Sequence, residues 1–229
     1  MALAALLLPM ALLQAQPAQT APPSPADITG GSRFERCVAL IQSAPDHAYE
    51  EGMAWAAETH ALGGYRCAAM ALVAENRADE GARRLESLAV SVNPNEPELR
   101  AELLSQAGNA WLIAHEPGQA RSAFTSAIAT VQSNPQNLPD LLIDRATAYA
   151  LERDYRHAEE DLSHALDVRP NDALALRLRA TARMHQSAFD LAEADAVEAT
   201  RIEPGNVDNY LVLGHVRESK RTGTPVDEQ

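Results

Sequence analysis

The stretch that decides the fold runs from residue 139 to residue 172 and reads PDLLIDRATAYALERDYRHAEEDLSHALDVRPND. Small side chains stand in its two halves at Ala146 and Ala158, and a larger apolar side chain, Leu142, precedes the first of them. Small residues let two helices approach closely, while larger residues fill the next gap. Pro170 cannot continue a helix, so the second half ends there. The stretch therefore predicts two short antiparallel helices joined by a turn.

The same pattern recurs on both sides of this stretch. The corresponding positions 34 residues downstream are Leu176, Ala180, Ala192, Ala199 and Pro204. The corresponding positions of an upstream copy are Leu104, Gly108, Trp111, Ala120, Phe124 and Ala127, with its proline three residues late at Pro135. Val207 begins one further helical pattern. Copies that repeat in one phase predict a row of stacked helix pairs.

These positions resemble the tetratricopeptide repeat (TPR), whose 34-residue signature is W-x2-L-G-x2-Y, then A-x3-F, A and P. The resemblance covers about residues 62–218. It implies an all-α fold: a right-handed α-solenoid of antiparallel helix pairs, with a C-terminal closing helix over the last apolar face.

The expected organisation has nine segments. They are a signal peptide (1–18), a flexible leader (19–32), an N-terminal helical pair (33–61), a degenerate repeat (62–100), three repeats (101–138, 139–172 and 173–206), a closing helix (207–220) and a flexible tail (221–229).

The first residues resemble an export signal. Residues 1–13, MALAALLLPMALL, are apolar but too short to span a bilayer comfortably, and small polar residues follow, as at the end of a secretory signal. A basic residue is missing from this region, and a membrane anchor or a buried helix is the alternative. We expect an exported bacterial protein, in the periplasm, without a stable membrane span after the signal is removed.

The two cysteines, Cys37 and Cys67, have neither CxxC nor zinc-ligand spacing. An even cysteine count in an exported protein predicts a disulfide. Cys37 falls on the first expected helix and Cys67 on the third, and alternate helices lie side by side in such an array. Two independent buried thiols are the alternative.

The resemblance implies that the first helices of successive pairs line a concave groove that commonly holds a peptide. The candidate groove residues are Asn109, Leu112, Ile143, Thr147, Arg177, Thr181 and His185. Some TPR proteins hold a terminal carboxylate with basic residues, but Ser105 and Ile143 stand where a basic residue would be needed. We therefore expect a peptide with apolar anchors and main-chain hydrogen bonds to Asn109 and Thr147. Ordinary solvated polar residues are the alternative.

Composition and motifs exclude several functions. The net charge of −13 would repel a phosphate backbone, so nucleic acid is not the expected partner. His157 and His164 are two helical turns apart, about 10 Å, which is too far for one metal ion without further ligands. Since no P-loop, nucleophile elbow, HExxH or dinucleotide motif occurs either, we expect no enzyme and no cofactor.

The expected function is that of an adaptor in the cell envelope that binds a protein or peptide. The alternative is a structural module that forms homo-oligomers through its array faces. An uncharacterised enzyme is the third possibility.

Overall fold

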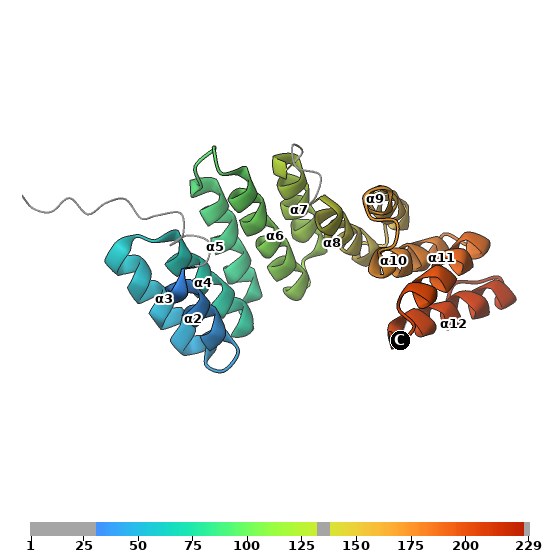
Figure 1. Ribbon diagram of the computed structural model, residues 1–229, viewed down its shortest axis with the longest axis horizontal. Coiled ribbons are helices and arrows are strands. Elements are labelled where there is room, and N and C mark those ends of the chain that lie inside the picture. Colours follow the sequence, from blue (N-terminus) through green and yellow to red (C-terminus); the bar gives the residue numbers. More distant parts are fainter. Residues whose placement is uncertain (1–30, 132–137, 227–229) are drawn as a thin grey trace, which may run out of the picture.

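The computed structural model describes residues 31–131 and 138–226, and over these residues it contains α-helices and no strand. The helices are α2 (Ser32–Ile41), α3 (Pro45–Thr59), α4 (Leu62–Ala74), α5 (Ala78–Ser91), α6 (Pro97–Ile113), α7 (Pro117–Val131), α8 (Leu138–Leu151), α9 (Tyr155–Val168), α10 (Ala173–His185), α11 (Phe189–Ile202) and α12 (Val207–Thr222). They form one row in which each helix packs against the next (Figure 1). This arrangement confirms the expected all-α solenoid.

Two of the expected segments lie wholly or largely outside the described residues. The signal peptide (1–18) is one, and the leader (19–32) overlaps the described part only at its last two residues. In the described part of the chain, no helix is long and apolar enough to cross a membrane.

The turns inside the helix pairs share one geometry. Each turn contains a residue with positive φ, in the left-handed region of backbone conformation, just after the earlier helix. These residues are His60, Asn76, His115, Arg153 and Ser187. In two of the turns, the Glu116 N–H donates to the Trp111 carbonyl at 2.9 Å and the Asp154 N–H donates to the Tyr149 carbonyl at 2.8 Å. This six-residue closure satisfies carbonyl groups that the helix end would otherwise leave unpaired.

The apolar core is a chain of clusters along the row. One cluster joins α2, α3 and α4, a second runs from α4 to α8, a third from α8 to α11, and a fourth joins α10, α11 and α12. Neighbouring clusters share helices, so burial is continuous along the row although no single centre exists. Each helix is therefore stabilised chiefly by its immediate neighbours.

Small residues allow the closest helix contacts, as the repeat pattern predicts. A Cβ atom added at Gly108 of α6 would lie 2.5 Å from the ring of Phe124 on α7. Any side chain at this position would have to move the fully buried ring.

The N-terminal end differs from the expected pairing of its first two helices (33–61). The closest approach there joins α3 to α4: a Cβ atom at Gly52 would lie 2.8 Å from the Gly64 carbonyl oxygen, and one at Gly64 would lie 2.7 Å from the Gly52 carbonyl oxygen. Gly52 and Gly64 are 12 residues apart, the same separation as Ala146 and Ala158 in the repeat. Helix α2 packs against both α3 and α4. Thus α3 and α4 form a close helix pair, because neither glycine has a side chain to keep the backbones apart.

Candidate peptide-binding groove

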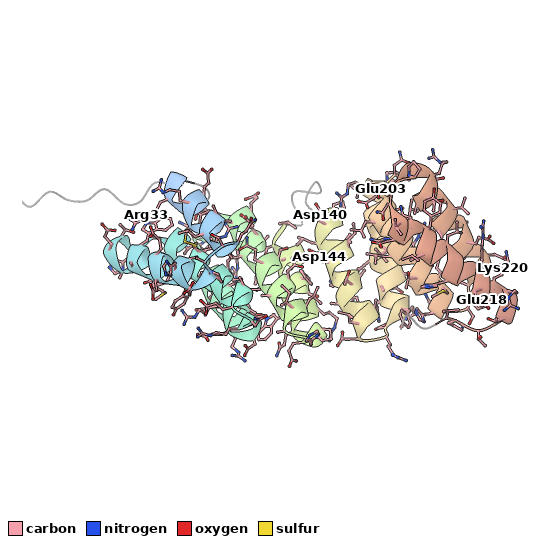
Figure 2. The ribbon with its side chains drawn as sticks, turned by 90° about the horizontal axis from the view of Figure 1, so that it is seen from below. Arg33, Asp140, Asp144, Glu203, Glu218 and Lys220 are labelled. Carbon is pink, nitrogen blue, oxygen red and sulfur yellow. A yellow bond between two sulfur atoms is a disulfide. The ribbon has the colours of Figure 1, made fainter. Side chains whose placement is uncertain are left out.

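The inner side of the array is formed by every second helix. Contacts between alternate helices join α6 to α8, α8 to α10 and α10 to α12. Elements on the inside of a curved row lie closer together than those on the outside. These four helices therefore line the concave side, with Asp140 and Asp144 of α8 near the middle of the row (Figure 2).

Exposed apolar side chains lie on all four inner helices. They are Ile113, Leu151, Leu174 and Leu211, with exposed fractions of 57%, 59%, 43% and 54%. Each occupies a position that the repeat pattern assigns to the groove. A single exposed leucine is common on protein surfaces. Four such side chains on the four inner helices, with Ile113 and Leu151 at equivalent positions of successive repeats, are a candidate contact surface.

Ile143 does not belong to this surface. Its side chain is only 5% exposed and packs in the α8–α11 cluster with Leu142 and Ala146. Helix α8 contacts helices on several sides, including α7, α9 and α6, so its buried face is wider than that of a helix at the edge of a bundle. Assigning Ile143 to the groove was therefore wrong. Leu112 is half-buried at the edge of the α4–α8 cluster.

Asn109 is exposed and is held by α8. Its side-chain amide donates a hydrogen bond to the carboxylate of Asp144. Burial raises the pKa of Asp144 from its ordinary value of 3.8 to about 6; the hydrogen bond from Asn109 opposes this rise, and the nearby charge of Asp140 adds to it. Within the described residues, no arginine or lysine pairs with Asp144. This carboxyl group was not predicted from the sequence, because its burial depends on how α6 and α8 pack.

Both candidate threonines bond to their own helix. The Thr147 hydroxyl donates to the Ile143 carbonyl at 3.0 Å, and the Thr181 hydroxyl donates to the Arg177 carbonyl at 3.3 Å. Such back-bonding is common for threonine inside helices. Their hydroxyl oxygens can still accept a hydrogen bond, so Thr147 can receive a peptide N–H.

Arg177 and His185 both have intramolecular contacts. Arg177 of α10 pairs with Asp208 of α12 at 2.8 Å, which ties two inner helices together. The His185 ring stacks on Tyr155 with ring centroids 4.2 Å apart. Both side chains therefore help to hold the scaffold.

A small acidic cavity opens between α6 and α8. It has a volume of about 190 Å³ and is lined by Glu98, Ala101, Glu102, Ser105, Val131, Asp140 and Leu141. Two of its carboxylates already have cationic partners: Glu102 pairs with the buried Arg66, and Asp140 pairs with Arg169 at 2.5 Å. Glu98 is exposed and has no ion pair within the described residues. The cavity thus keeps an acidic character.

A larger cavity, of about 550 Å³, opens beside the end of α6. It is lined by Asn76, Ala78, Asp79, Arg83, Trp111, Ile113, Ala114, His115, Glu116 and Gln119. These residues include the turn residues Asn76 and His115, so the cavity lies along the edge of the array where the helix pairs turn. Only Ile113 is common to this cavity and to the exposed apolar series.

Two largely buried ion pairs each join the two helices of one repeat, in two successive repeats. Arg145 of α8 binds both carboxylate oxygens of Asp161 on α9, at 2.8 and 2.7 Å. Arg179 of α10 binds Asp195 of α11 in the same way, at 2.8 and 2.9 Å. The two pairs are 34 residues apart, so the repeated arginine was the signal in the sequence that could have indicated them. Arg183, which replaces the repeat's aromatic residue, also bonds to Asp195, at 2.7 Å.

The two cysteines meet at the N-terminal end. A disulfide joins Cys37 of α2 to Cys67 of α4, with 6.2 Å between the Cα atoms, and both residues are buried. The first helix is thereby tied to the third, in the topology expected from alternate helices.

No protein-family model matches the chain. No curated protein matches it either. Solved structures do match it, so the likeness lies in the fold.

Three of these structures carry TPR or TPR-like repeats. A putative kinesin light chain with nearly identical TPR-like repeats from Podospora anserina has a TM-score of 0.63 and 16% identity, over 75% of this chain and 93% of its own. A thermophilic TPR protein from Thermus thermophilus has a TM-score of 0.53 and 15% identity, over 81% of this chain and 99% of its own. The first TPR domain of human RPAP3 has a TM-score of 0.50 and 22% identity, over 57% of this chain and 96% of its own. The chain therefore has the TPR fold, an α-solenoid of stacked helix pairs.

Proposed function

We propose that this chain is a non-catalytic scaffold that binds a protein partner by holding an extended peptide segment against α6, α8, α10 and α12. The observation that carries the proposal is the exposed apolar series of Ile113, Leu151, Leu174 and Leu211. Apolar surface of this kind is unfavourable in water, and a partner that covers it gains binding free energy.

The charges of the groove favour a basic residue in the bound segment. Glu98 and Asp144 have no cationic partner within the described residues, and the acidic cavity lies between their helices. A lysine or arginine placed there would favour the ionised form of Asp144 and strengthen association. The preferred ligand is therefore an extended segment with apolar side chains and at least one basic side chain.

We place this scaffold in the bacterial periplasm. The Cys37–Cys67 disulfide supports an oxidising compartment, because cytosolic thiols are generally kept reduced. The export signal expected over residues 1–18 is consistent with that location.

Selection from a random peptide library against the disulfide-bonded protein tests the groove. We expect enrichment of peptides that combine apolar and basic residues, and we expect their binding to shift the backbone amide signals of α6, α8 and α10. Leu151→Glu and Leu174→Glu should each abolish binding, since each places a charge among the apolar contacts. Val90→Glu is the matched control, because Val90 on α5 is 76% exposed but lies on no inner helix. Peptides that bind the outer helices, or that bind the Leu151 and Leu174 variants unchanged, would contradict the proposal.

A further inference from the structure

Helix α12 exposes a face that is buried on the corresponding helices of the earlier repeats, α6, α8 and α10. The exposed residues are Val207, Tyr210, Leu211 and Gly214. Gly214 stands at the repeat position of Gly108, Ala146 and Ala180, and those three residues are buried. A Cβ atom at Gly214 would meet no atom within 4 Å, whereas one at Gly108 would strike Phe124. The chain itself thus shows that this position can receive an aromatic ring.

An aromatic ring lies one helical turn away on the same helix. Tyr210 is four residues before Gly214, and residues four apart share a helix face. The Tyr210 side chain is 50% exposed, and it is the one aromatic among the large apolar side chains exposed in the described part of the chain. The face therefore carries both a projecting ring and the empty position that fits a ring.

We propose that α12 pairs antiparallel with α12 of a second copy, so that Tyr210 of each copy packs over Gly214 of the other. A two-fold axis near Val212 produces both contacts at once, because residue i then faces residue 424 − i. The absence of a Cβ atom at Gly214 lets the two backbones come close enough for the ring to be covered. Val207 then lies against the aliphatic part of Arg217 of the second copy.

The charges of α12 favour the antiparallel direction. Asp208 lies in its first turn, whereas near its C-terminal end Arg217, Lys220 and Arg221 outnumber the one acidic residue, Glu218. Although these side chains have partners within the chain, Asp208, Arg217 and Arg221 remain 62%, 59% and 71% exposed. Antiparallel pairing sets each acidic end beside a basic end, and it also opposes the two helix dipoles. A parallel arrangement would bring like charges together.

A second copy fits this face better than another segment of the same chain. Phe34 and Phe124 are buried in their own clusters and Phe189 packs against the α10–α12 cluster, so none of the three is available to fill Gly214. Contact through one helix per copy gives an interface at the small end of the range, and the net charge of −13 opposes association. The dimer should therefore form reversibly and only at high protein concentration.

Sedimentation velocity of the disulfide-bonded protein tests the pairing over a concentration range of roughly a hundredfold. The wild type should pass from monomer to dimer as concentration rises. Gly214→Ala should weaken dimerisation at least about tenfold while raising the melting temperature by a few degrees, because alanine favours the helix and its Cβ meets nothing in the monomer. Tyr210→Ser should also weaken dimerisation.

Leu191→Ser is the control for a general loss of apolar surface, since Leu191 on α11 is 54% exposed. It should leave dimerisation unchanged. A wild type that remains monomeric at every concentration would overturn the proposal. So would a dimer that Gly214→Ala and Tyr210→Ser leave intact, or one that Leu191→Ser weakens equally.

Discussion

Glycine has a structural role at Gly52 that its neighbours in sequence do not share. The Gly52 backbone meets that of Gly64 so closely that an added Cβ atom would lie within 3 Å of a carbonyl oxygen and of the Ala68 nitrogen. A backbone atom cannot rotate away as a side chain can. The contact between α3 and α4 therefore depends on the absence of a side chain.

Gly52→Ala should lower the free energy of unfolding by roughly 1–3 kcal/mol, because the two helices must separate to admit a methyl group. Urea denaturation followed by circular dichroism measures this change. Gly205→Ala is the matched control, since a Cβ atom there would meet nothing within 4 Å. Equal stability of the two variants would show that α3 can shift on α4 at no cost.

Asp144 makes stability depend on pH between about pH 4 and 6. Its pKa is about 6 in the folded protein against an ordinary value of 3.8, so the unfolded chain loses its proton first as the pH rises. The protonated carboxyl of Asp144 therefore favours the folded state. This contribution to the free energy of unfolding is present below about pH 4, decreases between about pH 4 and 6, and is lost at higher pH. Asp144→Asn should therefore stabilise the protein by roughly 1–3 kcal/mol at pH 8 and have little effect at pH 4.

Denaturant titration of wild type and Asp144→Asn at both pH values checks this dependence. Asp167→Asn provides a control on an exposed carboxylate of α9. A difference between wild type and Asp144→Asn that is the same at pH 4 and pH 8 would count against a raised pKa.

At the scale of single helices, buried ion pairs orient each helix pair in the second half of the chain. Asp195 on α11 receives Arg179 and Arg183 from α10, and the Asp195 residue is only 6% exposed. Removing one member of a buried ion pair leaves an uncompensated charge. The pairs at Asp161 and Asp195 therefore fix the rotation of one helix against the next.

Asp195→Ala should destabilise the protein by roughly 2–4 kcal/mol, because the half-buried guanidinium of Arg179 loses its counter-ion and that of Arg183 keeps only Glu159. Thermal and urea denaturation measure the loss. Glu198→Ala on the same helix removes the exposed pair with Arg201 and should leave the denaturation midpoint nearly unchanged. An equally small effect of Asp195→Ala would mean that water enters and solvates Arg179 and Arg183.

These ion pairs show why elements were easier to predict than their contacts. Helix order and turn positions follow from local periodicity and from residues such as Pro170. In contrast, Arg179 and Asp195 are 16 residues apart and lie on different helices, so their meeting depends on the helix packing. Without that packing, each is an ordinary charged residue in an amphipathic pattern.

At the scale of the whole molecule, stability should vary along the row. Each apolar cluster joins only neighbouring helices, so a local change is not transmitted through one central core. The disulfide between α2 and α4 is confined to one end.

Replacing both Cys37 and Cys67 with alanine should destabilise the N-terminal end by roughly 3–4 kcal/mol. The disulfide joins residues 30 positions apart, and without it the unfolded chain gains the conformational entropy of an open loop. Amide hydrogen exchange should speed up in α2, α3 and α4 and stay nearly unchanged in α10, α11 and α12. Uniformly faster exchange along the row would instead indicate one cooperative unit. Detection of two free thiols in the denatured, unreduced wild type would show that the disulfide does not form.

The amino-acid sequence by itself determined the class of fold, because the repeat spacing, small residues and turn signals act over one or two helices. It also determined that alternate helices would share one side, and hence where a groove should lie. Only the tertiary structure decided which side chains reach that groove. It buried Ile143, tied Arg177 to Asp208, placed Asp144 beside Asn109 and left Gly214 uncovered. The physical reason is that burial and pairing depend on several helices at once, whereas periodicity describes a single helix.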